Sequence, residues 1–291
     1  FYGRNNLGNN ISELSQYSPL YSTDPMWTTT IGPTSYPWMF SEADHTLFLP
    51  GTSLGDPLRA VDRNGNIKWS FASNNCTDLQ GYLSQSVDNV IFMQGCHTLY
   101  AVKPDGSLKW QKSDINDDWD HVISDEGKVF ARDTSKIYAM SQEDGTVLWE
   151  YSSHTPDNQF IYHNTELYVL GNGIKALDMQ GNLLWSFADG SFDDRELNYL
   201  ISEANLLIAF DYYAGKLYAL NIADGSLAWV YDSSATNQAS SRIFNLGLGD
   251  DGVVYIRTSH GLEAINPDGS LRWQRHKDDH GTLSAPHKLY V

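Results

Sequence analysis

The chain has 291 residues, and its 36 acidic side chains outnumber its 19 lysines and arginines, which gives a formal net charge of −17. A domain this acidic repels nucleic acid and anionic membrane surfaces, so neither is an expected partner. No apolar run approaches the roughly 20 residues that cross a bilayer, so direct membrane insertion is not expected either.

The first residues differ in character from the rest of the chain. Residues 1–20 are polar and rich in Asn, and no periodic pattern runs through them. We interpret them as a lead-in or edge segment in front of a single domain that spans residues 21–291. The chain begins with Phe1 and shows no signal peptide, so we expect a processed form or a fragment of a longer polypeptide.

One pattern recurs along the domain. It is clearest in Leu217–Trp229, which reads Leu-Tyr-Ala-Leu-Asn-Ile-Ala-Asp-Gly-Ser-Leu-Ala-Trp. Each copy ends on Trp, and successive Trp residues are 42, 41, 39, 36, 44 and 44 positions apart. A sequence period of about 40 residues is typical of repeat folds. The Trp residues that mark the repeat are Trp27, Trp69, Trp110, Trp149, Trp185, Trp229 and Trp273.

Each copy has the composition of a β-hairpin. An alternating apolar segment such as Leu217–Leu220 predicts a half-buried strand, and a dipeptide such as Asp224-Gly225 suits the positive φ of a tight turn. Two further apolar segments precede the hairpin, for example residues 199–202 and 206–210. The repeat therefore predicts four antiparallel strands in every period.

Four-stranded sheets that repeat radially cover both of their faces, so the expected fold is an all-β, seven-bladed β-propeller. The Trp that ends each copy would pack between neighbouring blades, and this structural role is preferred over ligand stacking. Trp27–Ile31 has the pattern of an outer strand, whereas residues 282–284 and 288–291 have the pattern of inner strands. We therefore expect the N- and C-terminal strands to share one blade, which closes the ring and removes two sheet edges.

The pattern of Leu217–Trp229 resembles the tryptophan-docking repeat of the pyrroloquinoline-quinone-like β-propeller family. That family contains quinone-dependent dehydrogenases, outer-membrane assembly scaffolds and uncharacterised surface modules, so the resemblance implies a fold but leaves the function open. The dehydrogenases carry paired adjacent cysteines, whereas Cys76 and Cys96 are twenty positions apart. The chain therefore resembles the assembly scaffolds more than the dehydrogenases, and no quinone is expected.

The two cysteines fall within one predicted blade. In a four-stranded blade, the loop that enters the first strand lies on the same face as the loop between the second and third strands. Cys76 falls in the former loop and Cys96 in the latter, so a disulfide between them is geometrically reasonable. A disulfide would indicate an oxidising compartment, periplasmic or extracellular. Two free thiols are the alternative.

The loops that follow each Trp are expected to emerge together on one face of the propeller, and they are rich in Asp. Function is expected on this face, because loops vary while the scaffold holds them, and the partner would be a protein or a glycan. The opposite face carries the short Asp-Gly turns and is expected to be structural. The candidate binding residues are Asp78, Trp119, His121, His154, Asp157, Asp193, Asp194, Arg195, Asp278 and Asp279.

One loop has the spacing of a calcium site. Asp114, Asn116, Asp118 and Asp120 alternate along the chain, and Ca²⁺ takes six to eight oxygen ligands of this kind. However, Trp119 stands where an EF-hand loop needs Gly, and no flanking helices are predicted. Ca²⁺ is therefore a candidate ligand, and a solvated acidic loop is the alternative. No other cofactor is predicted.

The preferred function is non-enzymatic binding or scaffolding by the acidic loop face. The alternative is a carbohydrate-active enzyme, a polysaccharide lyase or hydrolase, that uses the same face. Its acid and base groups would have to lie within hydrogen-bond distance of a substrate, yet no two candidates form a motif, and an acidic face would repel uronates. The oligomeric state is left open. The candidate catalytic residues are His121, His154, Arg195, Tyr199 and His280.

Overall fold

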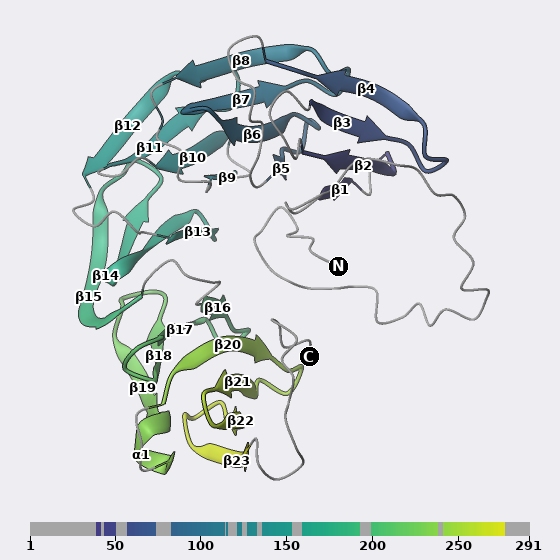
Figure 1. Cartoon of the computed structure of the whole chain (residues 1–291). Coiled ribbons are helices and arrows are strands. Elements are labelled where there is room, and N and C mark those ends of the chain that lie inside the picture. The colour runs from purple at the N-terminus through teal and green to yellow at the C-terminus, as the bar shows by residue number, and fades with distance from the viewer. Residues whose placement is uncertain are drawn as a thin grey trace. The chain divides into compact units, whose positions relative to one another are not determined.

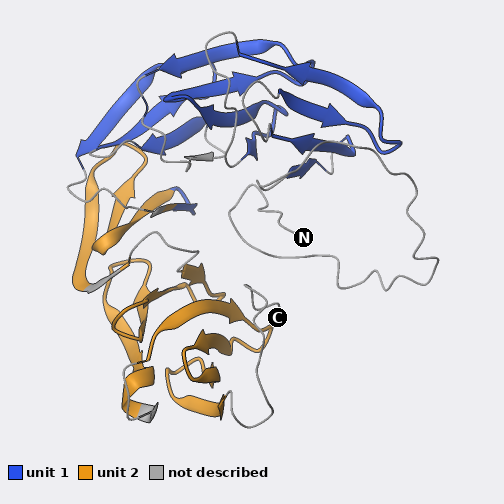
Figure 2. Ribbon diagram, viewed as in Figure 1, with its two compact units in different colours: residues 1–156, 161–165 blue, residues 157–160, 166–291 orange. Residues whose placement is uncertain are grey.

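The chain folds into antiparallel sheets (Figure 1). The structure, a computed structural model, describes residues 39–41, 44–50, 57–73, 83–113, 115, 121–123, 127–132, 136–152, 159–192, 199–237 and 241–276. Within these ranges, 23 strands and one short helix are formed. The chain divides into two compact units, residues 1–156 with 161–165 and residues 157–160 with 166–291 (Figure 2).

The first unit holds three four-stranded sheets, in each of which the strands follow one another in sequence order. Neighbouring strands are antiparallel, as the repeat predicts. The strands of the three sheets are β1 (Met39–Ser41), β2 (Thr46–Leu49), β3 (Leu58–Val61) and β4 (Ile67–Phe71); β5 (Ser84–Gln85), β6 (Ile91–Gly95), β7 (Thr98–Val102) and β8 (Leu108–Ser113); and β9 (His121–Ile123), β10 (Lys128–Arg132), β11 (Lys136–Ser141) and β12 (Val147–Ser152).

The second unit holds two further four-stranded sheets of the same order. A three-stranded sheet precedes them in the chain, and its first strand lies at the boundary between the units. The elements are β13 (Gln159–His163), β14 (Glu166–Asp178) and β15 (Leu183–Ser191); β16 (Tyr199–Ile201), β17 (Leu206–Asp211), β18 (Lys216–Asn221) and β19 (Leu227–Asp232); α1 (Ser233–Asn237); and β20 (Ile243–Leu248), β21 (Val254–Thr258), β22 (Gly261–Ile265) and β23 (Leu271–His276).

The three-stranded sheet departs from the predicted four strands. In its long strand β14, Tyr168 packs against Trp185, as an aromatic residue of the second strand does in other sheets. Ala176 of the same strand pairs with Trp185, as a residue of the third strand does in other sheets. One continuous strand thus takes the positions of two. Gly173 has a φ of 84°, and this left-handed residue lets the strand change direction without a separate loop.

The Asp-Gly turns join the third and fourth strands of the sheets. In the turn between β18 and β19, Gly225 has a φ of 71°, and the Ser226 N–H donates to Asp224 Oδ1 at 2.9 Å. The glycine alone takes the positive φ, while the aspartate contributes by accepting a backbone hydrogen bond two residues ahead. Asp105-Gly106 and Asp268-Gly269 repeat this arrangement.

An alanine stands opposite each Trp of the repeat that the structure describes. Ala219 pairs with Trp229 and Ala101 with Trp110, and in both ladders the register shifts directly after the alanine. A bulge at this point increases the local twist of the hairpin. This pairing explains why the Leu-Tyr-Ala-Leu pattern has alanine at its third position: the small side chain leaves room for the indole on the neighbouring strand.

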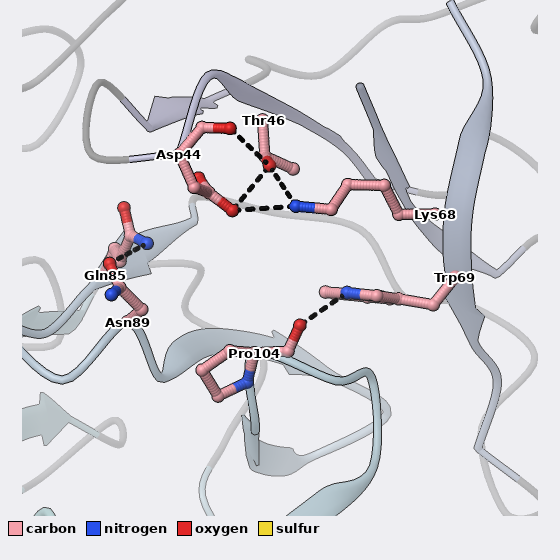
Figure 3. Close-up of polar contacts among 7 residues, drawn as sticks. All are labelled: Asp44, Thr46, Lys68, Trp69, Gln85, Asn89 and Pro104. Atoms are coloured by element: carbon pink, nitrogen blue, oxygen red, sulfur yellow. Dashed lines mark hydrogen bonds and ion pairs between the residues drawn. The ribbon is translucent and has the colours of Figure 1, made fainter. Parts of the chain in front are cut away.

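Within the two units, described Trp residues bridge one sheet to the next. Trp69 Nε1 donates to the Pro104 carbonyl at 2.8 Å (Figure 3), and Trp185 Nε1 donates to the Ile222 carbonyl at 2.8 Å. The rings lie directly on the glycines of the same turns, since a Cβ added to Gly225 would meet Trp185 at 2.4 Å. The same two contacts join Trp110 to Gln142 and Gly145, and Trp229 to Pro267 and Gly269.

Apolar side chains fill the space between neighbouring sheets. In the first unit, Phe48 and Leu58 of the first sheet pack with Ile91 and Met93 of the second. In the second unit, Phe210 and other residues of β17 to β19 pack with Ile243, Val254 and Ile256 of the last sheet. Within each unit, these clusters and the Trp bridges hold one sheet against the next. The predicted all-β architecture of antiparallel blades is confirmed.

The remaining parts of the fold prediction lie outside the described residues. Trp27 and residues 282–284 and 288–291, which were expected to share the closing blade, are among them, as is the lead-in segment 1–20. The seventh blade and the closure of the ring therefore stay predictions.

An ion pair across the first sheet should make the stability of the protein depend on pH. Lys68 Nζ lies 2.8 Å from Asp44 Oδ2, and Thr46 Oγ1 also donates to this carboxylate (Figure 3). Burial raises the pKa of Asp44, but the hydrogen bonds from Lys68 and Thr46 outweigh it and lower the pKa from 3.8 to about 2.

A carboxyl whose folded pKa is depressed adds stability above its unfolded pKa and loses it as the pH falls through the folded pKa. For Asp44 this window lies between pH 3.8 and about 2. We expect Asp44→Asn to melt below the wild type at about pH 5 and to approach it near pH 2. Melting curves followed by circular dichroism test this, and a difference that stays constant with pH would contradict it.

Candidate binding surface

Most of the candidate residues on the loop face lie outside the described residues. This holds for Asp78, Trp119, His154, Asp157, Asp193, Asp194, Arg195, Asp278, Asp279 and His280, and for the candidate calcium ligands Asp114, Asn116, Asp118 and Asp120. Tyr199 is half-buried at the start of β16 in the second unit, and the backbone of His121 begins β9 in the first. Within the described ranges, no group of three or more His, Cys, Asp or Glu residues is arranged to hold a metal ion.

Cys96 lies in a two-residue turn between β6 and β7, which is the loop in which the sequence places it. Cys96 and His97 have φ values of 49° and 57°, as a hairpin turn with two left-handed residues requires. Its side chain packs against the apolar cluster between the first two sheets. Cys76 lies outside the described residues, so the disulfide stays a prediction.

If the disulfide forms, its reduction should lower the free energy of unfolding by about 3 kcal/mol, because it closes a loop of moderate length in the unfolded chain. Denaturant unfolding with and without reductant measures this difference, and a Cys76→Ser/Cys96→Ser variant should be insensitive to reductant. Thiol labelling of the unfolded, unreduced protein is the direct control. Labelling of both cysteines would show that the bond is absent.

In the second unit, a cluster of aromatic and arginine side chains lies where the expected loop face would be. Three segments contribute to it: the turn between β17 and β18, the start of β20 with the residue before it, and the end of β21. We define the arginine–aromatic patch as Tyr212, Tyr213, Arg242, Phe244 and Arg257.

The rings of the patch meet edge to face. The ring centroids of Tyr212 and Tyr213 are 4.8 Å apart with an interplanar angle of 84°, and those of Tyr212 and Phe244 are 5.5 Å apart at 79°. Such pairs are stabilised beyond the burial of their area, so the rings hold one another in place. Tyr213 remains 50% exposed, which leaves part of the cluster open to solvent.

The two arginines lie over these rings. Arg242 Cζ is 5.7 Å from the ring centroid of Tyr212 and 5.8 Å from that of Tyr213, and Arg257 Cζ is 4.8 Å from that of Phe244. These distances are within the range of cation–π attraction. Arg242 is exposed, and Arg257 is partly exposed with its Nε buried and without a hydrogen-bond partner.

Neither guanidinium forms an ion pair in the part of the chain that the structure describes. This contrasts with Arg272 on β23, which lies 2.7 Å from Asp251. In a chain with 36 acidic and 19 basic side chains, carboxylates are abundant. The two patch arginines are thus positioned by aromatic rings and keep their capacity to bind a carboxylate.

A buried carboxylate supports the segment that carries Arg242. Glu263 on β22 is 2% exposed, and it accepts hydrogen bonds at 2.8 Å from both Tyr231 and Ser233. Ser233 Oγ lies 2.9 Å from the hydroxyl of Ser241, the residue before Arg242. This network connects β19, α1 and β22 with the segment that enters β20, and so fixes its backbone.

A glycine brings the aromatic turn close to the arginine segment. Gly215 ends the turn between β17 and β18, and a Cβ added to it would lie 2.0 Å from the Ser241 carbonyl oxygen. No other residue fits there without moving one of the two backbones. The contact between this turn and Ser241 places Tyr212 and Tyr213 beside Arg242.

The sequence reasoning missed the patch and the buried carboxylate. Glu263 was detectable, since it stands where the best copies of the repeat have tyrosine, as in Tyr100 and Tyr218. A charged residue at a buried position of a repeat is a signal of a special role. The patch had no such signal, because its members lie at strand ends and share no motif.

The meandering sheets and the Trp residues that bridge them define a repeat protein of the β-propeller class. A family model described as outer membrane protein assembly factor BamB matches residues 54–194 and 99–285, and the chain belongs to this family. The resemblance to the quinone-like propellers, and to their assembly scaffolds in particular, is confirmed. A comparison with curated protein sequences finds no match.

Solved structures agree with this assignment at the level of the fold. BamB from Moraxella catarrhalis superimposes with a TM-score of 0.63 and 17% sequence identity, over 81% of this chain and 74% of that one. Virginiamycin B lyase from Staphylococcus aureus gives a TM-score of 0.59 and 10% identity, over 87% of this chain and 85% of that one. In the described residues, no helix is long and apolar enough to cross a membrane.

Proposed function

We propose that this protein is a non-enzymatic scaffold of the periplasm or the cell exterior, which binds a partner protein through the loop face of its propeller. The arginine–aromatic patch carries this proposal, because it is a preorganised surface with two arginines that lack ion-pair partners in the described chain. Tyr and Arg dominate the binding energy of many protein interfaces. The chain belongs to a family whose model is described as an outer membrane protein assembly factor, and this membership also supports a scaffold function.

The enzymatic alternative has less support. It rests on five residues of which the structure describes the side chain of Tyr199 alone. The likeness to a lyase extends to the fold, and one fold hosts many unrelated functions. The patch, by contrast, has the composition of a binding surface.

Site-specific photo-crosslinking in the source cell tests the scaffold proposal. A benzoylphenylalanine at position 213 would report on the patch, whereas the same group at Val230, which is 46% exposed on the outer strand β19, is the matched control. We expect a discrete protein adduct from position 213 and none from position 230. Equal adducts at both positions, or none at either, would contradict binding through this face.

A further inference from the structure

We propose that the arginine–aromatic patch binds a polypeptide segment that presents Asp or Glu carboxylates next to an apolar side chain. This inference rests on the proposed scaffold function and names the chemistry of the partner. The acidic loops of the same face, which the sequence singles out, would repel such a segment. The patch would therefore be a place on this face where a partner carboxylate is accepted.

The arginines specify the anion. A guanidinium presents its N–H donors in a planar fork that matches a carboxylate, and charge-assisted hydrogen bonds of this kind are stronger than neutral ones. Arg242 and Arg257 are held over Tyr212 and Phe244, so much of the side-chain entropy that binding would cost is already lost in the free protein. Arg257 Nε is buried and has no hydrogen-bond partner among the described residues, so at this atom no hydrogen bond holds the side chain.

The rings specify the apolar neighbour. Tyr213 is half exposed beside Arg242, and Phe244 is partly exposed beneath Arg257. An aliphatic or aromatic side chain of the partner would cover this surface and exclude water from the carboxylate contact. Exclusion of water strengthens the ion pair, because the local dielectric falls.

The charge of the whole chain favours a peptide over a polyanion. A net charge of −17 repels nucleic acids and polyuronates at long range, and each further anionic group adds to this repulsion. A peptide with one or two carboxylates among neutral residues is repelled only weakly. The local pair of arginines then outweighs the distant acidic groups, which salt screens beyond about 10 Å.

Selection from a random 12-residue phage-displayed peptide library tests this inference without assuming a partner. We expect peptides recovered on the wild-type protein to be enriched at least threefold in Asp or Glu next to an apolar residue. The enrichment should disappear on Arg242→Gln/Arg257→Gln. It should persist on Arg272→Gln, which removes one positive charge from an arginine outside the patch that is already paired with Asp251.

A recovered peptide and its amide counterpart, with Asn and Gln in place of Asp and Glu, provide the quantitative test. Calorimetry should show at least tenfold weaker binding of the amide peptide to the wild type, as the loss of a charge-assisted hydrogen bond implies. Each of Arg242→Gln and Arg257→Gln should weaken binding of the acidic peptide by about fivefold or more. Melting curves establish that these variants remain folded.

Three outcomes would overturn the inference. The recovered peptides could show no excess of carboxylates, or the amide peptide could bind as tightly as the acidic one. The third outcome is that Arg272→Gln weakens peptide binding as much as the patch variants do. Inorganic phosphate and a short oligogalacturonate are tested as further ligands. If either shifted the NMR signals of Arg242 while acidic peptides did not, the patch would be an anion or glycan site instead. A protein adduct at position 213 together with any of these results would leave the scaffold function standing and reject only the partner chemistry.

Discussion

Replacing Trp185 by alanine is expected to lower the free energy of unfolding by about 3–5 kcal/mol, the range measured for large aromatic residues in cores. Trp185 is 8% exposed, its Nε1 donates to the Ile222 carbonyl, and its ring covers Gly225. The change removes the apolar contact and leaves the carbonyl without this donor. Urea unfolding monitored by circular dichroism measures the loss.

Two matched variants separate the contributions. Trp185→Phe keeps most of the ring area but removes the N–H, so we expect a smaller loss that includes about 1 kcal/mol for the hydrogen bond. Trp273 is 39% exposed and stands at the same position of the last described sheet, so Trp273→Ala should cost clearly less than Trp185→Ala. Equal losses at both Trp positions would mean that the bridges to the next sheet do not determine the stability.

Replacing Glu263 by alanine is expected to cost about 3–5 kcal/mol, because a buried donor left without its acceptor costs about 1–3 kcal/mol and more than one would be affected. Glu263 accepts hydrogen bonds from Tyr231 and Ser233 in the interior. Glu263→Gln keeps one carbonyl acceptor and should lose less. Unfolding in urea provides the measurement.

An exposed carboxylate is the control for Glu263. Glu150 forms an ion pair with Lys136 at 2.6 Å, and its side chain is 43% exposed. Exposed pairs contribute about 0–1 kcal/mol, so Glu150→Ala should have little effect. Because the Glu263 network holds the segment before Arg242, Glu263→Gln should also weaken crosslinking from position 213. A variant that loses stability but crosslinks normally would restrict Glu263 to a structural role.

The sheets were predictable because the same local sequence pattern recurs in several copies along the chain. Leu217–Trp229 predicted a hairpin, and the structure forms it as β18 and β19. Period-two alternation, an Asp-Gly turn and a terminal Trp are local signals, and local signals that agree with one another identify a strand reliably. The long strand β14 was missed, because the repeat predicts four separate strands in every period, and this prediction came from the other copies.

The binding surface was not predictable in the same way. Tyr212, Arg242 and Arg257 are brought together by three segments that lie far apart in the sequence. The helix α1 between β19 and β20 was also missed, since Ser233–Asn237 has no apolar periodicity. What places the patch is the close approach at Gly215 and the hydrogen bonds around Glu263, and both depend on the tertiary structure.

The direction of the Trp bridges has a consequence for synthesis on the ribosome. Trp69 reaches forward to Pro104 and Trp185 to Ile222, which are 35 and 37 residues later in the chain. Within a unit, a sheet with such a bridge therefore acquires this contact only when the following sheet has emerged. Nascent chains stalled at successive lengths should become protease-resistant one sheet behind the exit point, so that translation itself sets the order in which the domain is assembled.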